Sequence, residues 1–130
     1  MTAEPLREGT LARAVLAHIE AHPDQWDQTA LAKHAPHGTP TCDFAARAVL
    51  LAGARIDWSI YSAQIGAMAV VMDSLPFPVL PWTRSIPSVA RALLGLEPAD
   101  ADRLFRSANT LTDLRRIAAD LWPAAHPIGA

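Results

Sequence analysis

The spacing of apolar residues predicts a helix near the start of the chain, within residues 9–23. Four apolar side chains share one face of such a helix: Leu11, Val15, Leu16 and Ile19. Thr10 can cap its first turn. The helix should end at His22, because the residue before Pro23 is pushed out of the helical conformation. Residues 23–35 predict a helical turn or a short helix, with Trp26 and Leu31 facing inward.

A second helix is predicted after the loop at residues 36–40, between Thr41 and Gly53. Thr41 is placed to cap it, and Asp43 falls in its first turn, where the helix dipole favours an acid. Gly53 is a typical stop, since glycine adopts the left-handed conformation at little cost. The apolar side of this helix would consist of Phe44, Ala45, Ala48, Leu51 and Ala52.

The last third of the chain predicts three short helices with clear start and stop signals. Pro87 and Pro98 each stand near a helix start, and Gly95 lies where the first of the three should end. Thr110 and Asp113 have the spacing of a capping box, with Asp in place of the usual Glu or Gln. The apolar face of the final helix is Leu111, Leu114, Ile117, Ala118 and Leu121.

The middle of the chain is ambiguous. Ile56, Trp58 and Ile60 alternate with polar residues, which is the period of a strand. Residues 63–74 are apolar nearly all round, and we favour a buried helix there, with a small two-stranded hairpin near residues 55–72 as the alternative. Residues 75–87 hold four prolines and predict an extended connector. Together the patterns predict one mainly α domain over residues 1–130, with five or six short helices and flexible ends at 1–9 and 123–130.

Composition narrows the class of protein. The chain is 51% apolar and 18% charged, which is typical of a globular protein, and its formal net charge is −2. It therefore has no overall attraction to nucleic acid or to an anionic membrane. The longest apolar run has eight residues, far fewer than the ~20 of a spanning helix. With one cysteine there is no internal disulfide, and with no signal-like start we expect a cytoplasmic protein.

Cys42 is the first candidate for chemistry. At a helix start a thiol can have a lowered pKa, and a histidine base would complete a nucleophilic site. A cysteine-dependent enzyme using Cys42 with His34 or His37 is therefore an alternative function. No histidine stands at a spacing that fixes this geometry, and a lone cysteine is more often a small buried residue.

A zinc-binding module is a weaker alternative. His18 and His22 are four residues apart on a predicted helix, and Cys42 could add a third ligand. Near a helix C-terminus, however, histidines also simply complement the dipole, and we expect no cofactor. Residues 89–105 have the outline of a helix-turn-helix, but Asp100 and Asp102 offset its arginines. This pattern gives no basic stripe, so a nucleic-acid partner is not expected.

Aromatic residues beside prolines favour a binding surface. Phe77 and Trp82 lie in the proline-rich connector, and Trp122 precedes Pro123 at the end of the last helix. Tryptophan is enriched at interface hot spots. We therefore expect a non-enzymatic protein that acts by protein–protein interaction, through a protein partner or self-association, as a regulatory or accessory component of a larger assembly. No small-molecule substrate is identified.

Three stretches resemble a family of small uncharacterised bacterial and phage proteins. They are HIEAHPDQWDQTALA, GTPTCDFAARAVLLAG and VARALLGLEPADADRLFRSANTLTDLRRIAADL. The family patterns are H-P-x-x-W/F-[ND], G-T-x-x-C-F-A-G-W-A and L-L-G-L-x-x-x-x-A-x-x-L-F. Here Asp43 is inserted between Cys42 and Phe44, Ala46 and Arg47 replace Gly-Trp, and a second cysteine found in many members is missing. The resemblance implies a fold and a bacterial or phage setting, and no particular activity.

Overall fold

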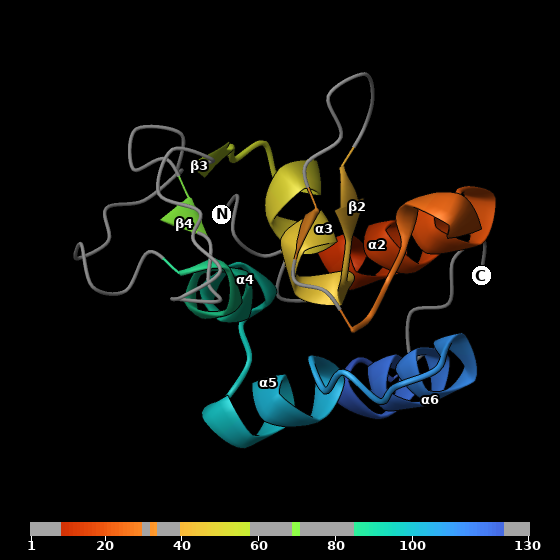
Figure 1. Cartoon of the computed structure of the whole chain (residues 1–130). Coiled ribbons are helices and arrows are strands. Elements are labelled where there is room, and N and C mark those ends of the chain that lie inside the picture. The colour runs from red at the N-terminus through yellow and green to blue at the C-terminus, as the bar shows by residue number, and fades with distance from the viewer. Residues whose placement is uncertain (1–8, 30–31, 34–39, 58–68, 71–84, 124–130) are drawn as a thin grey trace.

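The computed structural model describes residues 9–29, 32–33, 40–57, 69–70 and 85–123. Within these ranges the protein is mainly helical, as the sequence predicts, with five α-helices and short strands between them (Figure 1). The helices are α2 (Thr10–Ala21), α3 (Phe44–Leu51), α4 (Ile86–Leu94), α5 (Pro98–Leu104) and α6 (Leu111–Leu121), and the 3₁₀ helix η1 (Pro23–Gln25) follows α2. The predicted flexible ends lie almost entirely outside the described residues.

The strands among the described residues form two short antiparallel pairs. β1 (Ala32–Lys33) pairs with β2 (Thr41–Cys42), and β3 (Ile56–Asp57) pairs with β4 (Ala69–Val70). The second pair agrees with the hairpin alternative near residues 55–72. At residues 69–70 the favoured helix is therefore wrong, because the backbone there is extended and bonded to β3. Most of the proline-rich connector, and the rest of residues 58–84, lie outside the described residues.

Helix α3 lies at the centre of the fold and packs against both α2 and α4 (Figure 1). Its first six residues are buried on every side, because three of them are alanines that allow neighbouring helices to approach closely. Leu51, predicted to face the core, is instead 41% exposed. Helix α6 packs on α2 and α5, and α5 packs on α4.

The structure confirms the helix boundaries that glycine, proline and the capping box predicted from the sequence. Gly53 and Gly95 follow α3 and α4 with φ of 96° and 70°, a left-handed conformation that glycine adopts without strain. Pro98 opens α5, and α2 ends before Pro23. The capping box of α6 is present in full, with Thr110 accepting from the Asp113 N–H and Asp113 accepting from the Thr110 N–H.

Two predicted caps are wrong. Thr10 is the first residue of α2, whose N-cap is Gly9, with φ of 89° and no side-chain bond. Thr41 lies in β2, and the cap of α3 is Asp43, whose carboxylate accepts from the Ala46 N–H at 2.8 Å. The helix starts later than predicted because Cys42 is extended, pairing with Ala32 and accepting the Asp27 N–H.

The start of α2 touches the end of α6. A Cβ atom at Gly9 would lie 2.8 Å from Cβ and Cγ of Trp122, so only glycine fits without a shift of the indole. An ion pair between Glu20 and Arg115, at 2.8 Å, joins the same two helices further along.

Candidate functional site

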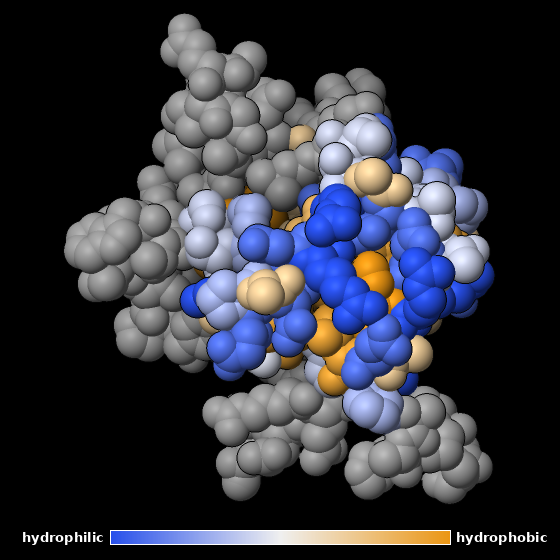
Figure 2. Space-filling view, turned by 90° about the horizontal axis from the view of Figure 1, so that it is seen from below, coloured by the Kyte–Doolittle hydropathy of each residue, from blue (hydrophilic) through white to orange (hydrophobic). Residues whose placement is uncertain are grey.

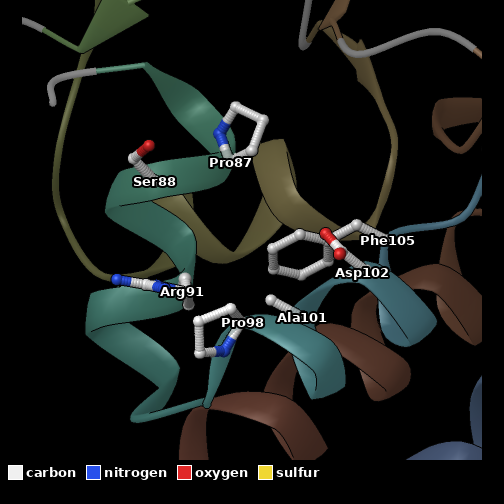
Figure 3. Close-up of a pocket in the computed structure, with 7 residues that line it drawn as sticks. All are labelled: Pro87, Ser88, Arg91, Pro98, Ala101, Asp102 and Phe105. Atoms are coloured by element: carbon white, nitrogen blue, oxygen red, sulfur yellow. The ribbon is translucent and has the colours of Figure 1, made fainter. Parts of the chain in front are cut away.

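A groove of about 280 Å³ runs between α4 and α5 (Figure 3). One wall comes from α4 and the other from α5 with the residue after it, and the lining residues are Pro87, Ser88, Arg91, Pro98, Ala101, Asp102 and Phe105. The Phe105 ring points towards α4, between the two prolines (Figure 3). Only a short turn, from Gly95 to Glu97, separates the two helices, and the groove needs residues of both.

Two amide side chains donate hydrogen bonds to the backbone carbonyls on either side of Phe105. Gln28 Nε2 donates to the carbonyl oxygens of Leu104 and Arg106, at 3.5 and 3.2 Å. Asn109 Nδ2 donates to the Leu104 carbonyl at 3.0 Å. The backbone on both sides of Phe105 is therefore fixed, which gives its ring a defined position in the groove.

The groove carries one charge of each sign. Arg91 lies on the α4 side and Asp102 on the α5 side, and both are exposed. Neither side chain has an ion pair or a hydrogen bond with any other part of the described chain. By contrast Arg103, on the same helix as Asp102, is paired with Asp120 at 2.6 Å. The charges of Arg91 and Asp102 remain available to a ligand or partner.

The face formed by α5 and α6 is mixed in character. Seen from that side, apolar groups show as small patches between hydrophilic side chains (Figure 2). No broad apolar face is visible in this view of the described residues. The pairing of Arg103 with Asp120 also removes one arginine from the helix-turn-helix outline, which leaves the second helix without a basic stripe.

The structure places Cys42 in an environment that suits packing. The thiol is 1% exposed and lies within hydrogen-bonding distance of the Pro40 carbonyl, with Sγ and O 3.7 Å apart. Burial raises the pKa of the Cys42 thiol to about 11, partly opposed by the nearby Arg47 charge. Because Cys42 lies in β2 and not in the first turn of α3, its thiol does not have the helix-start environment that the sequence suggested. His34 and His37 lie outside the described residues.

Native Cys42 should react slowly with iodoacetamide. At pH 8 a thiol of pKa about 11 is ~0.1% thiolate, against roughly a quarter for an unperturbed cysteine. We expect labelling of the folded protein to be at least ~100-fold slower than labelling of the same chain in concentrated urea, followed by mass spectrometry. Equal rates in the two states would revive the cysteine-enzyme alternative.

His18 and His22 lie side by side, and the described residues place no third metal ligand beside them. The His18 and His22 ring centroids are 4.6 Å apart, and burial, Arg47 and His22 together lower the pKa of His18. Across the described ranges, no group of three His, Cys, Asp or Glu side chains lies close enough to hold a metal ion. Likewise, no helix in those ranges is long and apolar enough to cross a membrane.

Of the predicted interaction residues, the structure describes one. Trp122 is half-buried against the core and beside Gly9. Phe77 and Trp82 lie outside the described residues. The prolines that line the groove were recognised in the sequence only as helix starts.

Three polar residues are buried, which the sequence analysis did not predict. Gln28 links three segments, Asp43 caps α3, and Arg47 is 3% exposed on the helix that packs at the centre of the fold. The Arg47 Nη2 donates to the carbonyls of Pro40 and Gln25, at 2.7 and 3.3 Å. Arg47 interrupts the alanine-rich run of α3, but its position alone does not distinguish a buried arginine from an exposed one.

Comparison of the chain with protein-family models, with curated proteins and with solved structures finds no significant match. The family resemblance noted in the sequence therefore stays a prediction.

Proposed function

We propose that this protein acts without catalysis, by binding a protein partner through the groove between α4 and α5. In this role it would be a regulatory or accessory component of a cytoplasmic assembly, in the bacterial or phage setting that the family resemblance implies.

The observation that carries the proposal is the composition of the groove. Pro87, Pro98 and the Phe105 ring offer rigid apolar surface, which costs little side-chain entropy to immobilise. Arg91 and Asp102, exposed on either wall, add directional charges. A concave surface that combines apolar side chains with exposed charges is typical of a recognition surface.

The alternatives have less support. A cysteine nucleophile requires a thiolate, and burial keeps the Cys42 thiol protonated at neutral pH. A zinc module needs more than the two histidines on α2, since structural zinc sites use four ligands. Neither alternative uses the groove.

A photo-crosslinking amino acid at Ser88 tests the proposal in the native host. Ser88 is exposed and lines the groove, whereas Ala17 is exposed on α2, outside the groove, and provides the control. We expect a defined crosslinked protein from position 88 and none from position 17, with the product identified by mass spectrometry. If position 88 yields no defined product, or both positions yield the same one, the groove is not the binding surface.

A further inference from the structure

The occupant of the groove can be inferred from its charges. A ligand that satisfies the groove must carry an anion opposite Arg91 on the α4 wall and a cation opposite Asp102 on the α5 wall. The groove itself has this pair of charges. In a two-fold dimer the same surface of each copy takes part in the contact. If Arg91 of one copy contacts Asp102 of the other, then Asp102 of the first copy contacts Arg91 of the second, and both ion pairs form together.

We propose that a second copy of this chain occupies the groove, in a two-fold dimer where Arg91 of each copy pairs with Asp102 of the other. This inference rests on the proposed function and specifies its partner. The prolines and the Phe105 ring of the two copies would pack between the ion pairs. Because the two charges have no other partner within the described residues, the dimer breaks no existing contact.

The size of the surface sets the strength of the dimer. Seven residues line the groove, whereas a stable interface commonly uses about 20–30 residues on each side. We therefore expect weak, reversible association, with a dissociation constant on the order of 10–1000 µM. Its ion pairs are exposed to solvent, so raising the salt concentration should weaken it.

Charge reversal tests the pairing directly. Arg91→Asp sets a second carboxylate against that of Asp102 twice per dimer, and Asp102→Arg places two guanidinium groups together twice. By sedimentation velocity over a concentration series, each variant alone should associate about 10-fold or more weakly than the parent. An equimolar mixture of the two variants should associate again, because each position then meets its opposite charge. A variant that carries both Arg91→Asp and Asp102→Arg should also regain association.

Matched controls separate this effect from a change in net charge. Arg13→Asp and Asp24→Arg make the same charge changes on α2 and η1, outside the groove, and should associate like the parent. Circular dichroism checks that each variant is folded. Should a reversal unfold the chain, Arg91→Ala and Asp102→Ala replace it, and each should still weaken association.

The outcomes distinguish the two proposals. A protein that is monomeric at ~1 mM, yet crosslinks to a different protein from position 88, overturns the dimer and leaves the proposed function standing. Absence of both association and crosslinking overturns both. If the charge-reversal variants associate as strongly as the parent, the contact involves another surface and the proposed dimer is wrong. The same conclusion follows if a mixture of the two variants fails to associate.

Discussion

Replacing Gln28 by leucine should lower the free energy of unfolding by about 3 kcal/mol. Gln28 is buried and joins three segments that are far apart in the sequence. Its Oε1 accepts from the Trp26 indole N–H at 3.0 Å and from the Phe44 N–H at 3.2 Å. Its Nε2 donates to the two carbonyls that flank Phe105.

Leucine would fill a similar volume and make none of these bonds. The Phe44 N–H and the indole N–H would be left without a partner, and a buried unsatisfied donor costs about 1–3 kcal/mol. The carbonyls lose less, because Leu104 O also accepts from Asn109 Nδ2 and Arg106 O from the Asn109 N–H. Urea denaturation of both proteins measures the difference.

Two further variants sharpen this prediction. Gln25→Leu makes the same chemical change on η1, at a half-buried side chain that forms none of these bonds, and should shift stability by less than ~0.5 kcal/mol. Gln28→Glu keeps the acceptor and places an oxygen opposite two carbonyls, so it should be more destabilising at pH 8 than at pH 5. Equal losses in Gln28→Leu and Gln25→Leu would contradict the bridging role.

The second large effect concerns Asp43 and pH. Burial raises the pKa of this carboxyl to about 7, from 3.8 as its ordinary value, partly opposed by backbone N–H groups that donate to it. The folded protein therefore keeps the proton up to near neutral pH, while the unfolded chain has already lost it. The folded state binds more protons between these pH values, so stability falls as the pH rises through this window.

Between pH 5 and pH 8 the loss from Asp43 should be about 2–3 kcal/mol. His18 acts in the opposite direction, since its lowered pKa favours the folded state as the pH rises. Asp43→Asn isolates the carboxyl, because asparagine caps helices as well as aspartate and does not titrate.

Urea denaturation at several pH values measures both proteins. The parent should lose ~2–3 kcal/mol relative to Asp43→Asn on going from pH 5 to pH 8. The contribution of His18 is present in both proteins and cancels in this difference. Parallel pH profiles would show that the Asp43 carboxyl is ionised in the folded protein throughout.

Local signals predicted the helix boundaries well where the signal is complete within a few residues. The capping box at Thr110 and the stop at Gly95 depend only on neighbouring backbone groups, and both are present in the structure. At residues 41–43 two residues could cap the same helix. The choice of Asp43 depends on the pairing of Cys42 with Ala32, which lies ten positions away and carries no local pattern.

The candidate site was harder to predict for the same reason. Pro87, Arg91 and Phe105 each fit an ordinary helical pattern, and they line one groove only because of the angle between α4 and α5. Arg47 and Gln28 are polar residues that a hydrophobic pattern assigns to the surface. Their burial depends on carbonyl and amide partners from other segments, at distances that periodicity does not encode.

The contact between Gly9 and Trp122 has a consequence for how this fold can be joined to other chains. Helix α2 begins where α6 ends, so residues 9 and 122, near the two ends of the described part of the chain, lie side by side. A chain joined at these two residues could be inserted into a loop of another protein without stretching its host, because the two attachment points are already neighbours.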